Sequence, residues 1–247
     1  MNKTAILVQA RSRSTRLPQK CFLPLPKLSN QTIIDWVHYR LSLTEIDVWF
    51  LVPSTDTPIQ TYLEKAGIPY LIGSEDDVRE RYRIAAQKLD LDFIVRATAD
   101  NPFVEWQHVI MSIKQIQELQ CDLFSFTGLP LGLGVEIFRR DSLCADIEPI
   151  QPIHREHVSL HIKHYPEKFK VVHQLSPIIR TWQKETNISL DTIRLTIDED
   201  ADYNTALKIA DHLSIDFKLH QLLQLIESKP ELFTGNQDIE QRRFYRS

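Results

Sequence analysis

Short apolar runs rich in β-branched residues alternate with amphipathic segments along the first half of this 247-residue chain. Such alternation is typical of βαβ units, in which each parallel strand is followed by a helix that returns the chain across the sheet. Apolar residues at three- and four-residue spacing predict helix faces at Ile33, Ile34, Val37 and Leu41, and at Val109, Ile110, Ile113 and Ile116. The runs predict strands at Thr4–Val8, Val48–Val52, Tyr70–Ile72, Phe93–Arg96, Asp122–Phe126, Val135–Phe138 and Arg194–Ile197. We therefore expect an α/β fold, a doubly wound, mostly parallel sheet in a Rossmann-type three-layer α/β/α arrangement.

The length of the chain is compatible with one domain, and we treat residues 1–247 as a single unit. From about Ser142 to Asp191 the pattern changes to helical segments with a lone strand near Lys170–His173. We interpret this region as a subdomain for acceptor binding or dimerisation. Helices are predicted again at Asp202–Leu213 and Phe217–Glu227, and residues 237–247 form a polar tail.

Charge is distributed unevenly along the chain. The net charge is −4, yet residues 1–34 contain six cations and no acid. A local cationic patch on an acidic protein suits a compact polyanion such as a nucleoside triphosphate, whereas a long nucleic acid usually needs a basic face. The sequence therefore disfavours a nucleic acid as the partner.

Other features indicate a cytoplasmic protein. No apolar run reaches the roughly 18 to 20 residues that cross a bilayer, so we expect no membrane insertion. The first apolar run, Ala5–Val8, is too short for the core of a signal peptide and is followed by arginines. Cys21, Cys121 and Cys144 are few and far apart, so we interpret them as packing residues.

A cationic segment follows the first predicted strand, where ligands bind in open α/β sheets. It carries Arg11, Arg13, Arg16 and Lys20, which offer bidentate and point-charge contacts to phosphate oxygens and to a leaving pyrophosphate. The chain has six glycines and the first is Gly67, so neither a GxGxxG dinucleotide loop nor a P-loop is present here. The alternative is a solvated cationic surface loop.

Two carboxylates are candidates for a magnesium site, because Mg²⁺ prefers hard oxygen ligands. Asp100 and Asp198 each follow a predicted strand. Helix capping by Asp198, Asp200 and Asp202 is the alternative, since acids stabilise a helix amino terminus.

Two further segments carry polar residues. Ser74, Asp76 and Asp77 precede a predicted helix that carries Val78 and Arg81, and they suit either a pyrimidine pocket or an N-capped helix start. Histidines recur at helical spacing, but an HExxH order and a well-placed carboxylate are lacking, so zinc binding is disfavoured. These histidines are His154, His157, His161 and His164.

Four ordered motifs resemble one family. Gln9-Ala-Arg-Ser-Arg-Ser-Thr-Arg-Leu-Pro-Gln-Lys20 is similar to the signature loop of the cytidylyltransferases, which include the CMP-sialic acid and CMP-Kdo synthetases. Gly73–Tyr82, Val95–Pro102 and Arg155–Val158 with Arg194–Asp198 resemble, in the same order, the spore-coat polysaccharide biosynthesis protein F group. The resemblance spans about residues 3 to 205 and implies a nucleotide-diphospho-sugar transferase-like fold. Arg13 and Gln19 stand where the family commonly has Gly in the loop, and Gly134 stands where family members often have Asp.

The resemblance implies a role for each matching residue. Arg11, Arg16 and Lys20 are expected to be catalytic, Asp100 and Asp198 to bind Mg²⁺ with Asp200 as the helix cap, and Arg155 and His157 to face the acceptor. Glu136 is expected either to bind acceptor hydroxyls or to be a satisfied acid at a strand end. The expected nucleotide-binding residues are Gln9, Ala10, Arg11, Ser14, Arg16, Lys20, Ser74, Asp76, Asp77, Val78, Arg81 and Thr98.

The expected activity is transfer of CMP from CTP to an anionic sugar-acid, phosphate or phosphonate acceptor, with release of pyrophosphate. The resemblance further implies Mg²⁺ as cofactor, a homodimer, and a role in surface polysaccharide or related biosynthesis. Two alternatives are a nucleotide-binding sensor or assembly protein without catalysis, and a glycosyltransferase that uses a nucleotide sugar.

Overall fold

The structure is a computed structural model that describes residues 2–147 and 151–239. The strands are β1 (Thr4–Gln9), β2 (Val48–Pro53), β3 (Tyr70–Gly73), β4 (Phe93–Thr98), β5 (Leu123–Thr127), β6 (Glu136–Arg139) and β7 (Val171–Leu175). The helices are α1 (Ile33–Ser42), α2 (Thr57–Ala66), α3 (Val78–Lys88), α4 (Trp106–Leu119), α5 (Arg140–Cys144), α6 (Pro152–Glu156), α7 (Leu160–His164), α8 (Pro177–Thr186), α9 (Asp200–Ala210) and α10 (Leu219–Ser228), with 3₁₀ helices η1 (Lys20–Phe22) and η2 (Pro230–Phe233).

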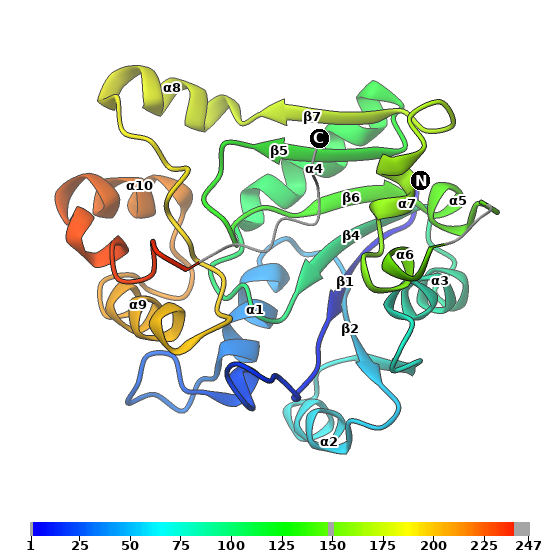
Figure 1. The fold of residues 1–247 in the computed structure, drawn as a ribbon, viewed down its shortest axis with the longest axis horizontal. Helices are drawn as coiled ribbons and strands as arrows, with labels where there is room; N and C mark the ends of the chain where they lie inside the picture. The colour runs from blue at the N-terminus through cyan, green and yellow to red at the C-terminus, as the bar shows by residue number, and fades with distance from the viewer. Residues whose placement is uncertain (1, 148–150, 240–247) are drawn as a thin grey trace.

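The seven strands form one mostly parallel sheet in the order β3-β2-β1-β4-β6-β5-β7. β6 pairs antiparallel with both of its neighbours, β4 and β5. The other pairs, including β5 with β7, are parallel. The expected doubly wound α/β fold is confirmed (Figure 1).

Alternation along β1 explains the three layers. Ile6 and Val8 face one side of the sheet, where they pack in a core with residues of α1, α2 and α4. Ala5 and Leu7 face the other side and pack with residues of α3, α5 and α7. Because successive side chains of a strand point to opposite faces, a continuous apolar run supports helices on both faces.

A third core joins the C-terminal helices to one end of the sheet. It contains residues of α1, α8, α9 and α10, together with Leu195 and Ile197. Figure 1 shows α8, α9 and α10 gathered beyond the carboxyl ends of β5 and β7. This cluster forms one wall of the edge at which ligands of α/β sheets bind.

The strand predicted at Arg194–Ile197 is wrong. Arg194 makes a single isolated bridge with Leu131, and the segment belongs to no strand of the sheet. The bridge partner Leu131 is followed by Gly132, which has a φ of 98°, and the pairing does not extend beyond this one bridge. Leu195 and Ile197 owe their burial to the C-terminal core, which is why the segment resembles a strand in sequence.

The region from Ser142 to Asp191 contributes to the same sheet and layers. β7, predicted near Lys170–His173, is confirmed and forms the sheet edge beside β5. α6 contacts α3 and α7. Acceptor binding or dimerisation by this region stays a prediction, and residues 240–247 of the expected polar tail lie outside the described residues. No helix in residues 2–147 and 151–239 is long and apolar enough to span a membrane.

Candidate active site

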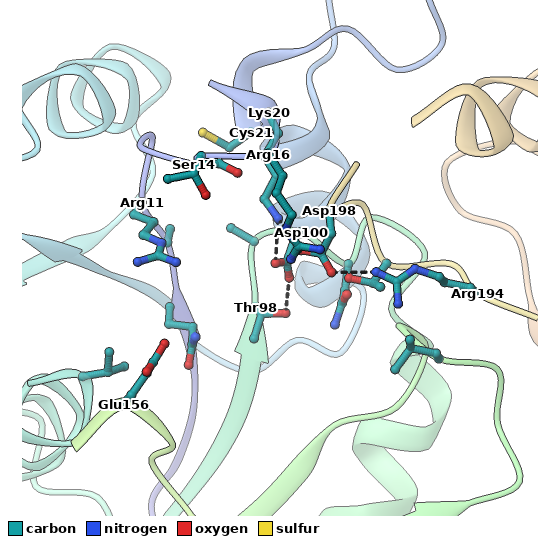
Figure 2. Close-up of a pocket in the computed structure, with 18 of the residues that line it drawn as sticks. Arg11, Ser14, Arg16, Lys20, Cys21, Thr98, Asp100, Glu156, Arg194 and Asp198 are labelled. Carbon is teal, nitrogen blue, oxygen red and sulfur yellow. Dashed lines mark hydrogen bonds and ion pairs between the residues drawn. The ribbon is translucent and has the colours of Figure 1, made fainter. Parts of the chain in front are cut away.

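A polar cleft of about 460 Å³ opens at the carboxyl ends of β1 and β4. Gln9 and Thr98 are the last residues of these two strands, and the loops that follow them line the cleft (Figure 2). The lining comprises Gln9, Ala10, Arg11, Ser14, Thr15, Arg16, Lys20, Cys21, Val78, Arg81, Thr98, Ala99, Asp100, Asn101, Leu131, Glu156, Arg194, Thr196 and Asp198.

The cleft brings together most of the residues expected to bind nucleotide or metal. From the expected set, the lining contains Gln9, Ala10, Arg11, Ser14, Arg16, Lys20, Val78, Arg81, Thr98, Asp100 and Asp198. Sequence reasoning did not assign Glu156, Arg194 and Thr196, although each lies within a quoted motif. Leu131 lies in none of the four motifs, so the sequence did not point to it; in the structure it lines the cleft and forms a bridge with Arg194.

The expected base-binding residues Ser74 and Asp77 lie outside the cleft lining and cap α3. The Ser74 hydroxyl accepts a hydrogen bond from the Asp77 amide at 3.1 Å, and the Asp77 carboxylate accepts one from the Glu80 amide at 2.7 Å. Asp76 is exposed in the same turn. The contacts of Ser74 and Asp77 match the N-cap alternative, and base binding by this loop stays a prediction.

The expected acceptor residues also lie outside the lining. The Glu136 carboxylate accepts hydrogen bonds from Lys163 and, at 2.5 Å, from the Ser159 hydroxyl. Burial raises the pKa of Glu136, but Lys163 and Arg96 outweigh it and lower the pKa to about 2. Glu136 is thus a satisfied acid in this structure.

Arg155 and His157 lie at the end of α6. The exposed Arg155 guanidinium is 3.9 Å from the Asp77 carboxylate. His157 occupies the C-cap of the helix. Because neither residue lines the cleft, their contact with an acceptor stays a prediction.

The loop after β1 keeps its shape without glycine. The Ser12 amide and hydroxyl donate to the buried Asp56 carboxylate at 2.6 and 2.5 Å, which attaches the loop to the start of α2. Gln19 has a φ of 56°, in the left-handed region that favours glycine. A glycine at position 19 would adopt this conformation without strain. Arg13 is not among the described residues with positive φ.

The cations of this loop meet acids from distant segments. The Lys20 ammonium lies 3.0 Å from Asp100 Oδ2 and 2.9 Å from Asp198 Oδ1, and it donates to the Ile197 carbonyl at 2.7 Å. Arg16 pairs with Glu199 at 2.9 Å and lies 3.5 Å from Asp198. The two expected metal ligands therefore converge on one cation in this structure (Figure 2).

The pKa shifts of Lys20 and Asp198 favour the charged form of each side chain. Burial lowers the pKa of Lys20, but Asp100 and Asp198 outweigh it and raise the pKa. Burial raises the pKa of Asp198, but Lys20, Arg16 and Arg194 outweigh it and lower the pKa. The ammonium and the carboxylate are both charged at neutral pH.

A second pair of cations in the cleft, Arg11 and Arg81, lies farther from carboxylates than Lys20 does, although Asp77 and Glu75 act to raise the pKa of Arg81. In the described ranges, Arg11 and Arg81 form no ion pair, and the charge of Arg11 contributes to a lowered pKa of Arg81, after burial as the main cause. Arg81 is 6% exposed and donates to the Leu51 carbonyl at 3.2 Å. A Cβ at Gly73 would lie 2.6 Å from the Arg81 side chain, so glycine makes room for it. This end of the cleft is the natural place for an anion.

The donor set fits a divalent cation bound together with phosphates. Within residues 2–147 and 151–239, no three histidine, cysteine or acidic side chains gather as a metal site made of protein alone. Mg²⁺ is commonly held by one or two carboxylates plus substrate phosphates, and Asp100 and Asp198 supply two carboxylates directed at a common point.

The helix cap differs from the expectation. Glu199 occupies the N-cap of α9, so the assignment of Asp200 as the cap is wrong. The Asp202 carboxylate accepts from the amides of Asp198 and Glu199 at 2.9 and 3.1 Å. Asp202 has this role because it lies one turn into the helix and points back toward its start.

A family model described as cytidylyltransferase matches residues 5–246. This chain belongs to the cytidylyltransferase family. The spore coat polysaccharide biosynthesis protein SpsF of Bacillus subtilis is 27% identical over 246 residues, covering 95% of this chain and 98% of that protein. A solved cytidylyltransferase from Leptospira borgpetersenii has a TM-score of 0.82 and 27% identity, covering 98% of this chain and 100% of that one.

A more distant solved structure shares the fold. A CMP:2-keto-3-deoxy-manno-octonic acid synthetase solved with CTP has a TM-score of 0.61 and 13% identity, covering 86% of this chain and 100% of that one. The sequence resemblance to cytidylyltransferases and to the spore-coat group is therefore confirmed.

Proposed function

We propose that this cytidylyltransferase transfers CMP from CTP to an anionic acceptor and releases pyrophosphate. The observation that carries the proposal is the juxtaposition of two kinds of group in one cleft. Arg11 and Arg81 form an anion-binding end, and Asp100 and Asp198 form a cation-binding end. A metal–triphosphate complex needs both ends, and the family membership selects CTP among the triphosphates.

The reaction joins an acceptor oxygen to the α-phosphorus of CTP and breaks the bond between the α-phosphorus and the bridging oxygen of pyrophosphate. In this proposal Arg11 and Arg81 stabilise the negative charge on the phosphates, and Arg16 and Lys20 stabilise the charge on the leaving pyrophosphate. Asp100 and Asp198 would hold Mg²⁺, which neutralises phosphate charge when bound.

The acceptor supplies the nucleophile in this proposal. Cys21 is the thiol in the cleft lining, and burial followed by the charge of Asp56 raises its pKa to about 12. A protonated thiol is a poor nucleophile. We propose a sugar acid, a phosphate or a phosphonate as the acceptor, used in surface polysaccharide or related biosynthesis, since the Bacillus subtilis relative bears that role in its name.

Pyrophosphate release tests the proposal. Each of the four nucleoside triphosphates is incubated with Mg²⁺ and a panel of sugar acids, phosphorylated polyols and phosphonates. Of the four nucleotides, we expect only CTP to support turnover. Asp100→Asn and Asp198→Asn are expected to abolish it while circular dichroism stays unchanged. Asp211→Asn, an exposed acid at the end of α9, is the matched control. Tight CTP binding by calorimetry without turnover on any acceptor would favour a nucleotide-binding protein without catalysis.

A further inference from the structure

Asp202 is a buried acid with more hydrogen bonds than a helix cap needs. It is 1% exposed in the first turn of α9. Its Oδ2 accepts from the amides of Asp198 and Glu199 and from Arg194 at 3.3 Å. Its Oδ1 accepts from Arg194 Nε at 2.8 Å and from Asn236 Nδ2 at 2.8 Å. Capping uses the amide contacts alone, so the other three contacts call for a separate reason.

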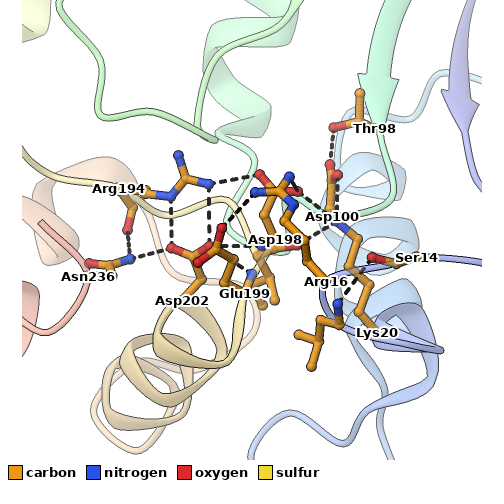
Figure 3. A network of polar contacts seen from close by, with 12 residues as sticks. Ser14, Arg16, Lys20, Thr98, Asp100, Arg194, Asp198, Glu199, Asp202 and Asn236 are labelled. Carbon is orange, nitrogen blue, oxygen red and sulfur yellow. Dashed lines mark hydrogen bonds and ion pairs between the residues drawn. The ribbon is translucent and has the colours of Figure 1, made fainter. Parts of the chain in front are cut away.

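Arg194 connects this buried acid to the cleft. Its side chain is 8% exposed, and its Nη2 donates to Asp198 Oδ2 at 2.8 Å. The other oxygen of the same carboxylate, Oδ1, faces Lys20 at 2.9 Å. A planar guanidinium held at Nε and Nη2 has a fixed direction. Arg194 thus holds one oxygen of Asp198, while the other lies in the cleft beside Lys20 and, at 3.5 Å, Arg16 (Figure 3).

Asn236 completes the arrangement from the C-terminal side. It lies just after η2 and is 2% exposed. Its side-chain amide donates to the Arg194 carbonyl at 3.0 Å as well as to Asp202. One amide group therefore holds both the backbone of Arg194 and the acid that orients its guanidinium (Figure 3).

Asp198 is consequently held at two points, its amide by Asp202 and its carboxylate by Arg194. Its amide donates directly to Asp202, and its carboxylate is bound by the arginine that Asp202 orients. Rotation of the Asp198 carboxylate would break the contact with Arg194, and displacement of its backbone would break the contact with Asp202. Groups that orient a metal ligand in this way typically change metal affinity 10- to 100-fold when they are removed.

We propose that Asp202, Arg194 and Asn236 are positioning residues that present Asp198 Oδ1 to the metal-bound triphosphate. This inference rests on the proposed function, because it requires Asp198 to act as a ligand. The proposal gives Asn236, in the turn after η2, a part in the reaction although Asn236 does not line the cleft.

The test uses the full chain with Mn²⁺ and CTP. Asn236→Ala removes both amide contacts at small cost in volume, and Asp202→Asn keeps the shape of the acid while removing its charge. We expect each variant to weaken Mn²⁺ binding in the presence of CTP about 10-fold or more, measured by electron paramagnetic resonance. The KM for Mg²⁺ should rise by a similar factor, with a smaller change in kcat at saturating metal. Asp200→Asn, an exposed acid in the same helical turn, should leave both quantities unchanged.

Two results overturn the inference, and they are distinguishable. If Asn236→Ala lowers the melting temperature but leaves Mn²⁺ affinity and the KM for Mg²⁺ at wild-type values, the network is structural and positions nothing. If the wild-type chain itself binds no Mn²⁺ with CTP and shows no turnover, the proposed function fails and the positioning role fails with it.

Discussion

Replacing Lys20 by Met tests how the cleft balances its charges. The ammonium lies 3.0 and 2.9 Å from two carboxylates, and its side chain is 13% exposed. Removing one partner of a buried ion pair costs about 3–5 kcal/mol. Here Asp100 and Asp198 are 29% and 23% exposed, and Arg16 and Arg194 stay beside Asp198, so we expect about 2 kcal/mol.

The assay is thermal unfolding without nucleotide, in EDTA and in Mg²⁺. A loss of about 2 kcal/mol corresponds to a fall of roughly 4–8 °C in Tm for a chain of this size. In the variant the two carboxylates have lost the cation between them and can bind Mg²⁺ instead. At about 100 times its Kd, Mg²⁺ should raise the free energy of unfolding of the variant by about 2.7 kcal/mol. In the wild type the same Mg²⁺ should have little effect, since Lys20 already occupies these oxygens.

Lys65→Met, an exposed lysine on α2, controls for the loss of one positive charge and should change neither Tm nor its response to Mg²⁺. The reasoning is refuted if Lys20→Met melts at the wild-type temperature in EDTA, or if Mg²⁺ stabilises the wild type as much as the variant.

Three further outcomes are expected. Glu136→Gln should lower the free energy of unfolding at pH 7. The difference from the wild type should shrink as pH falls from about 4.5 toward 2, because the lowered pKa of Glu136 stabilises the folded state only while its carboxylate is charged. Urea unfolding at a series of pH values measures this difference. Gln19→Gly should add up to about 1 kcal/mol to the free energy of unfolding in urea, whereas Arg13→Gly should lower it, since of these two positions only 19 has a left-handed backbone. Gly132→Ala should lower the free energy of unfolding by about 2 kcal/mol or more and weaken CTP binding by calorimetry, because φ is 98° and a Cβ would lie 2.6 Å from the Thr196 amide nitrogen.

The fold was predictable because its central parallel strands, β1, β2 and β4, are mostly buried on both faces. β1 and β4 are short, mostly apolar and rich in β-branched residues, and their length and the amphipathic segments between them identify them as strands. The segment Arg194–Ile197 has the same local pattern, yet it lacks a strand beside it and pairs only through Leu131. Local periodicity reports burial, and it cannot say which neighbour provides that burial.

The sequence predicted which residues belong to the candidate site better than it predicted the contacts between them. Residue type and position identify the loop cations and two acids; Arg11, Arg16, Lys20, Asp100 and Asp198 line one cleft, whereas Arg13 does not. Their pairing was hidden, because Lys20 is separated by 80 residues from Asp100 and by 178 from Asp198. Asp202 was interpreted only as part of a helix-start cluster, since nothing in the sequence shows that Arg194 and Asn236 lie beside it.

The pairing of Arg16 and Lys20 with acids also limits how far the charge of the cleft extends into solvent. A neutralised pair has a field that decays faster than that of a single ion, and salt screens what remains beyond roughly 8 Å at physiological ionic strength. Long-range attraction of a triphosphate is then weak. The association rate of the triphosphate should depend little on ionic strength. Different anions should therefore differ mainly in their dissociation rates.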